Sequence, residues 1–206
     1  MKTRSKSTFF AVLFAATAIA FITNCSGKKD DGGHSDHETT EDASGSNEQQ
    51  TTKPRFEVDR AFQKQMADVF SSYVDLKNAL VSSDAGKVRE EATDTEEVVA
   101  KVDMKLLSGA AHNDWMNYLT PIQSSLKDIQ ASDDIEAQRR AFSALSENLY
   151  KNIKAFGLGG DEAYYTYCPM AFDNQGAFWL SENDEISNPY FGDKMLKCGE
   201  VKEKLQ

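Results

Sequence analysis

The sequence is poor in the residues on which most enzyme centres depend. It has three cysteines and three histidines, and it contains no G-x-S-x-G, H-E-x-x-H or C-x-x-C pattern. Two of the histidines, His34 and His37, stand in a polar N-terminal stretch. A catalytic triad or a histidine-rich metal centre is therefore hard to assemble, and we expect a protein that is not an enzyme.

Positive charge is also scarce. The chain has 23 lysines and arginines against 33 aspartates and glutamates, which gives a formal net charge of -10. A surface of this sign repels nucleic-acid phosphates and anionic lipid. We therefore expect no nucleic-acid partner and no electrostatic grip on a membrane.

A long hydrophobic run is missing as well. The longest apolar run, Phe9–Ile22, spans about 14 residues, which is too short for a transmembrane helix. It follows the basic residues Lys2, Arg4 and Lys6. This arrangement is typical of a secretory signal peptide, which we place at residues 1–24. Without its three cations the chain has 20 basic and 33 acidic side chains, a net charge of -13.

Cys25 follows the apolar run directly, and small residues come after it. With Ile22 three positions before the cysteine, the segment resembles a bacterial lipobox, which implies cleavage before Cys25 and lipid attachment to it. The alternative is an ordinary signal peptide with a stray cysteine. Lipidation leaves an even pair of thiols in an exported protein. It predicts a protein tied to a membrane of the cell envelope by Cys25, the outer membrane favoured over the inner, facing the periplasm or the cell surface.

Residues 25–55 combine the lipidated cysteine with a polar segment that cannot bury enough surface to fold. A flexible segment of this length gives an average reach of about 30 Å. His34 and His37 in this tether are either solvated linker residues or weak collectors of metal ions.

Apolar residues then recur at helical spacing over residues 56–157. Asp59, Ser82–Asp84 and Ser132–Asp134 are capping signals, Ser108-Gly109 separates the second stripe from the third, and Gly157 is a C-terminal stop. The pattern predicts a mainly α fold, an antiparallel up-down four-helix bundle, in which Pro121 kinks or restarts the third helix. The apolar stripes contain Phe62, Met66, Val69, Phe70, Tyr73, Leu76 and Leu80; Val88, Ala92, Thr95, Val99, Val102 and Leu106; Trp115, Leu119, Ile122, Leu126 and Ile129; and Ile135, Phe142, Leu145, Leu149, Ile153 and Phe156.

Residues 158–206 lack the helical spacing of the preceding segment. They predict a small C-terminal unit of β-hairpin and loop packed on the bundle. Tyr164–Tyr167 has high strand propensity. Tyr164–Phe172 and Ala177–Ser181 flank the turn signal 173–176 and are predicted to form a hairpin. Asp193 is a candidate cap for one helical turn that presents Met195 and Cys198. The unit is too small to fold alone.

Cys168-Pro169-Met170 and Met195-Leu196-Lys197-Cys198 pair one thiol with one thioether each. On a strand, positions i and i+2 share a face, and on a helical turn, i and i+3 do so. Two thiols and two thioethers form the soft ligand set that selects Cu(I) or Ag(I). The alternative is a disulfide between Cys168 and Cys198, with Met170 and Met195 as packing residues. His112 is a weak further ligand candidate, and otherwise a partly exposed residue at a helix start.

The C-terminal block contains Tyr167–Phe172, Gly176, Trp179–Ser181, Ile186, Asn188–Asp193, Met195 and Cys198-Gly199. This block resembles the signature of a bacterial domain of unknown function. That domain occurs alone in lipoproteins of Bacteroidetes-type bacteria and fused to periplasmic adaptor subunits of Cus-type copper and silver efflux pumps. The resemblance implies a periplasmic helical domain linked to heavy-metal handling, with Cys168, Met170, Met195 and Cys198 as candidate ligands. Weaker similarity to the helical part of that domain is found at Tyr73–Leu80, Trp115–Tyr118 and Arg139–Ser146.

The sequence thus favours a lipid-anchored envelope protein that buffers Cu(I) or Ag(I), or hands it to a heavy-metal efflux system. An efflux-pump adaptor or another envelope protein is the expected partner. The alternative is a disulfide-stapled protein-interaction domain of the cell envelope with no metal role.

Overall fold

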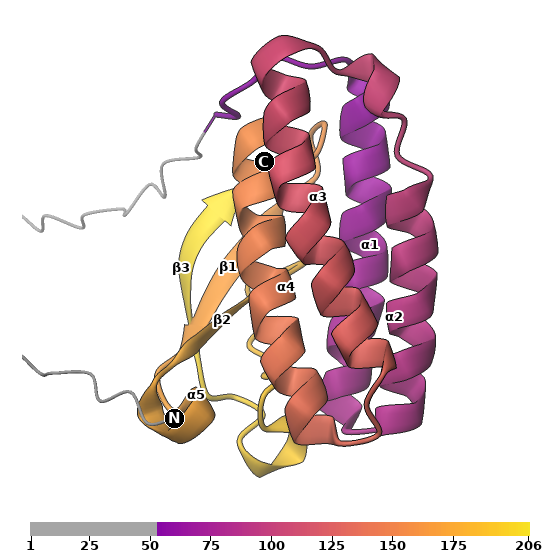
Figure 1. Cartoon of the computed structure of the whole chain (residues 1–206). Helices are drawn as coiled ribbons and strands as arrows, with labels where there is room; N and C mark the ends of the chain where they lie inside the picture. The colour runs from indigo at the N-terminus through magenta and orange to yellow at the C-terminus, as the bar shows by residue number, and fades with distance from the viewer. Residues whose placement is uncertain (1–52) are drawn as a thin grey trace, which may run out of the picture. The chain divides into compact units, whose positions relative to one another are not determined.

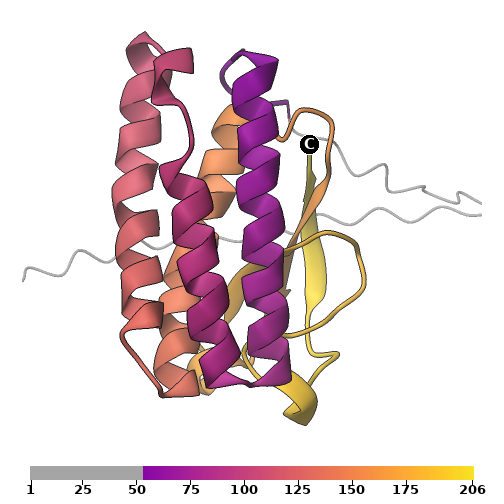
Figure 2. The same ribbon diagram turned by 90° about the vertical axis from the view of Figure 1, so that its right-hand side faces the viewer.

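Four long helices run up and down side by side and account for most of the described chain (Figures 1 and 2). The computed structural model describes residues 53–206, and the predicted signal peptide, Cys25, His34 and His37 lie outside this range. The predicted mainly α fold is confirmed. The helices are α1 (Arg60–Ser82), α2 (Ala85–Ala100), α3 (Gly109–Gln130) and α4 (Ile135–Phe156), and a short 3-10 helix, η1 (Met104–Leu106), joins α2 to α3.

The aspartates at the predicted helix starts act as caps. The side chains of Asp59, Asp84 and Asp134 each accept a hydrogen bond from a backbone N–H in the first turn of α1, α2 and α4. Each bond satisfies a donor that has no partner within the helix. Pro121 lies inside α3 without ending or restarting it, so the expected restart does not occur.

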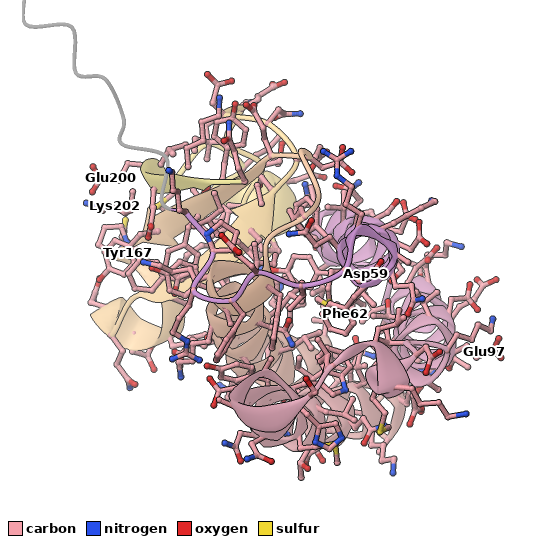
Figure 3. The ribbon with its side chains drawn as sticks, turned by 90° about the horizontal axis from the view of Figure 1, so that it is seen from above. Asp59, Phe62, Glu97, Tyr167, Glu200 and Lys202 are labelled. Atoms are coloured by element: carbon pink, nitrogen blue, oxygen red, sulfur yellow. The ribbon has the colours of Figure 1, made fainter. Side chains whose placement is uncertain are left out.

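The apolar stripes of the four helices meet in one core. Figure 3 shows Phe62 pointing into the bundle while Glu97 points away from it. Phe62 packs edge-on against Trp115 of α3 and Phe156 of α4, with ring centroids 5.4 and 5.2 Å apart. Within residues 53–206 no helix is both long and apolar enough to cross a membrane.

A three-stranded antiparallel sheet lies against α4 (Figure 1). Its strands are β1 (Ala163–Cys168), β2 (Ala177–Ser181) and β3 (Glu200–Leu205), in the order β2-β1-β3. The hairpin of β1 and β2 was expected, although its first strand ends at Cys168 rather than at Phe172. β3 was not expected from the sequence, for which no strand was predicted after Cys198. Two short elements complete the unit, α5 (Ala171–Asn174) and the 3-10 helix η2 (Gly192–Lys194).

Candidate sulfur site

The sheet brings the two C-terminal cysteines together. Cys168 is the last residue of β1 and is fully buried. Cys198 comes two residues before β3, and Glu200 of β3 pairs with Tyr167 of β1. The antiparallel register therefore places Cys198 beside the end of β1, and the two sulfur atoms lie 2.8 Å apart as free thiols.

Asn188 holds the segment that carries Cys198. Its buried side-chain amide donates to the Cys198 carbonyl at 2.6 Å, and its Oδ1 accepts from the Tyr190 N–H at 2.8 Å. Its backbone N–H donates to the Leu196 carbonyl at 2.9 Å. One asparagine thus joins the two ends of the loop 188–198 and fixes the backbone at Cys198.

Gly199 allows that backbone to approach the core. Its φ is +152°, and a Cβ at this position would lie 2.6 Å from the ring of Trp179. Any other residue would push Cys198 away from β1. The position of the second thiol therefore depends on a residue without a side chain.

The two methionines are placed differently from the cysteines. Met170 lies beyond the end of β1 and is 45% exposed, while Cys168 is buried. The expected arrangement of both on one strand face is therefore absent. The predicted turn at Met195 is present, since the Cys198 N–H donates to the Met195 carbonyl at 3.0 Å.

Met170 and Met195 nevertheless line one cavity of about 540 Å³. It lies between the start of α4, the turn after β1 and the loop before Cys198. Met170 also reaches the thiol pair through its backbone, which hydrogen-bonds the Cys198 sulfur. The other lining residues are Glu136, Arg139, Arg140, Phe172, Asp173, Asn174, Tyr190, Phe191 and Lys194.

The turn after Met170 is strained. Phe172, Asp173 and Asn174 have φ values of 51°, 56° and 66°, a left-handed conformation that side chains other than glycine rarely adopt and that costs on the order of 1–3 kcal/mol per residue. Asparagine and aspartate tolerate it better than phenylalanine does. Phe172 is held there by edge-on packing against Tyr190 at 5.2 Å.

Arg139 is a contributor that the sequence analysis did not single out as a site residue. It is 2% exposed, and its Nε donates to the Pro189 carbonyl at 2.9 Å. Its Nη1 pairs with Glu136 at 2.6 Å, and its Nη2 donates to the Ser83 hydroxyl at 2.9 Å. The sequence does contain a signal for this role. The apolar positions of α4 are interrupted between Ile135 and Phe142, where Gln138 and Arg139 stand.

Burial raises the pKa of the Cys198 thiol to about 11, and both the hydrogen bond and the electrostatic interaction with Cys168 add to the effect. At neutral pH Cys198 is therefore a protonated thiol. A metal ion that takes it as a ligand must displace this proton.

His112 does not join the four sulfurs. It lies in the first turn of α3, which begins at the end of the bundle opposite α5 (Figure 1). Among residues 53–206, no three His, Cys, Asp or Glu side chains cluster in a way that would hold a metal ion.

The comparison with protein families bears on the helical part. Residues 69–161 match the family model described as Protein of unknown function (DUF3347). That segment is similar to the DUF3347 family. The expected relation to a domain of unknown function is thus confirmed. The match extends from within α1 to Asp161 and stops before β1, so the DUF3347 match includes none of the four sulfur residues. No curated protein and no solved structure matches the chain.

Proposed function

We propose that the protein is a lipid-anchored envelope protein that binds Cu(I) or Ag(I) through Cys168 and Cys198, and buffers the ion or passes it to a heavy-metal efflux system. Met170 and Met195 complete the ligand set. The observation that carries the proposal is the approach of two free thiols to 2.8 Å from segments 30 residues apart in sequence. The proposed function includes no chemical reaction on a substrate.

The donor set supports a soft monovalent ion. Thiolates and thioethers select Cu(I), whereas zinc favours more thiolates or imidazoles and hard cations favour oxygen ligands. Met170 and Met195 line one cavity, which neither cysteine lines, and the Met170 backbone hydrogen-bonds the Cys198 sulfur. A methionine side chain has three rotatable bonds, so both thioethers can turn toward an ion held by the thiols.

The charges around the cavity support a site that binds its ion as a neutral or anionic thiolate complex. Arg139, Arg140 and Lys194 line the cavity with Glu136 and Asp173. Two thiolates and one Cu(I) carry a net charge of about -1, which neighbouring cations stabilise. The positively charged side chains do not attract a metal cation while the thiols are protonated. The affinity for the ion therefore depends on deprotonation of the thiols.

The same approach of the thiols also favours a second candidate, a disulfide-stapled interaction domain. A bond across 30 residues would stabilise the C-terminal unit by roughly 3–4 kcal/mol in the chain-entropy account. The two candidates use the same atoms. In our proposal the disulfide is the oxidised form of the metal site.

A competition titration tests the metal site. The reduced full-length chain is titrated with Cu(I) against a chelator of known affinity, and we expect one ion per chain. Replacing both cysteines by serine abolishes binding, and Met170→Leu with Met195→Leu weakens it at least about tenfold, since each lost soft ligand is worth a kcal/mol or more.

The matched control is Met104→Leu with Met116→Leu, because these two methionines are 39% and 38% exposed and lie outside the cavity. Equal affinity in the two methionine variants would remove Met170 and Met195 from the site. Failure of the reduced wild-type chain to bind Cu(I) would reject the metal function.

The thiol state of protein taken from the cell envelope separates the two candidates. Intact mass before and after alkylation counts the free thiols. Two free thiols, or two thiols released only after a Cu(I) chelator is added, support the metal site. A disulfide that stays oxidised in metal-loaded cells supports the interaction domain.

A further inference from the structure

A second cavity, of about 350 Å³, lies where the chain first enters the bundle. The segment that precedes α1 crosses the end of α4 (Figure 1), where the Arg55 and Phe56 N–H groups donate to the carbonyls of Lys154 and Ala155 at 3.2 and 2.9 Å. Phe56 stacks on Phe156 with ring centroids 5.6 Å apart. These contacts fix the wall of the cavity that Lys53 and Arg55 form.

The charge of this cavity is opposite to that of the chain. Four of its seven lining residues are Lys53, Arg55, Lys151 and Lys154, and none is acidic, although acidic side chains outnumber basic ones by 33 to 23 in the sequence. Gathering four like charges is unfavourable unless something compensates for their repulsion. The other three lining residues are Tyr118, Tyr150 and Ala155.

Two of the four cations are compensated and two are not. Arg55 pairs with Asp114, and Lys154 pairs with Glu203 at 3.0 Å. Lys53 and Lys151 make no ion pair with any residue in 53–206. Four cations and two carboxylates therefore leave two positive charges for a ligand.

The tyrosines supply a neutral donor. The Tyr118 hydroxyl accepts a hydrogen bond from Arg55 Nη2 at 3.2 Å and donates none to the described part of the chain. Tyr150 is occupied, since it donates to Glu203 at 2.5 Å and accepts from Lys154 at 3.1 Å. The proton of Tyr118 is thus available to an acceptor in the cavity.

We propose that this cavity binds a phosphate-bearing anion, with Lys53 and Lys151 opposing its charge and Arg55 and Tyr118 hydrogen-bonding its oxygens. Two surplus positive charges match a phosphate dianion, and about 350 Å³ accommodates a phosphate with a small substituent. Free phosphate and the headgroup of a phospholipid share this chemistry. The cavity is distinct from the sulfur site and its test does not depend on metal binding.

Thermal unfolding of the full-length chain tests the site, with inorganic phosphate and glycerol phosphate as probes and chloride at matched ionic strength as reference. Excluded anions also stabilise proteins without binding, so the readout is the difference between two double variants. Lys53→Gln/Lys151→Gln removes the unpaired cations, and Lys105→Gln/Lys127→Gln removes two exposed lysines outside the cavity.

We expect a saturable rise of the unfolding midpoint in the wild type and the control, with apparent affinity at least about tenfold weaker in the cavity variant. Tighter binding of glycerol phosphate than of phosphate assigns the site to a headgroup, and equal or weaker binding assigns it to the free anion. Equal shifts in the two variants with both probes would overturn the proposal.

Discussion

The helical bundle and the C-terminal unit (residues 158–206) are held by different kinds of contact. Within the bundle, apolar stripes meet along the whole length of the helices. The C-terminal unit adds buried aromatic side chains and a few polar anchors, in which Tyr73, Lys77 and Arg139 of the bundle hold Leu180, Glu182 and Pro189. The bundle is therefore held by many apolar contacts, whereas the position of the sulfur site depends on a few individual side chains.

The largest effect is expected where the two regions share a side chain. Phe142 is fully buried, stacks on Tyr73 at 5.0 Å and contacts Tyr190 at 6.1 Å. Phe142→Ala should lower the free energy of unfolding by about 3–5 kcal/mol, since it opens a cavity in the core. Denaturant unfolding measures the change, and a loss below about 1 kcal/mol would show that the junction is loosely packed.

Arg139→Met should loosen the C-terminal unit, because the buried Pro189 carbonyl loses its donor, and the expected loss of stability is about 1–3 kcal/mol. Hydrogen exchange should quicken at residues 188–198 before it quickens in α2 and α3. Arg140→Met is the control, because Arg140 is the exposed neighbour. Uniform acceleration across both regions would contradict the anchor role.

Tyr73→Phe removes one hydroxyl that accepts from the Leu180 N–H at 3.1 Å and bonds the Ser146 hydroxyl at 2.7 Å. We expect a loss of about 1–2 kcal/mol, because both partners are buried. Tyr164→Phe, whose hydroxyl bonds the half-exposed Glu162, should change stability by much less. Similar losses in the two variants would mean that the buried hydrogen bonds of Tyr73 contribute no more to stability than the hydrogen bond of Tyr164.

The smallest effect concerns pH. Because the Cys198 pKa is raised from its ordinary value of 9.0 to about 11 in the fold, its contribution to stability is complete below pH 9 and is lost as the pH rises through 11. Reduced wild-type protein should therefore lose more stability over this range than Cys198→Ser. Burial also raises the pKa of Tyr73 and Tyr190 in the fold, so these tyrosines ionise on unfolding in the same pH range and lower stability there. The difference between the two proteins is therefore the measure, and equal slopes would contradict the raised pKa of Cys198.

These contrasts also explain which features were predictable from the sequence. Helices depend on local spacing and caps, so Asp59, Asp84 and Asp134 marked the starts of three helices. β3 was missed because Glu200, Lys202 and Lys204 give an edge strand a charged pattern, and its pairing with β1 is distant in sequence. Figure 3 shows Tyr167, Glu200 and Lys202 on this side of the sheet, with Lys202 over the Tyr167 ring.

The sulfur site was predictable in composition but not in geometry. Residue types alone marked Cys168, Met170, Met195 and Cys198 as a soft set. The strand end at Cys168 depends on the left-handed turn at Phe172, which the sequence disfavours and tertiary packing against Tyr190 imposes. The role of Arg139 depends on a carbonyl 50 residues away, which no local pattern reports.

The most direct measurement is X-ray absorption at the copper edge of the reduced protein loaded with one equivalent of Cu(I). The account predicts a first shell made of sulfur only, with fewer sulfur atoms after Met170→Leu and Met195→Leu and no change after Met104→Leu and Met116→Leu. A shell that contains oxygen or nitrogen ligands, or one that is the same in all three proteins, would contradict it.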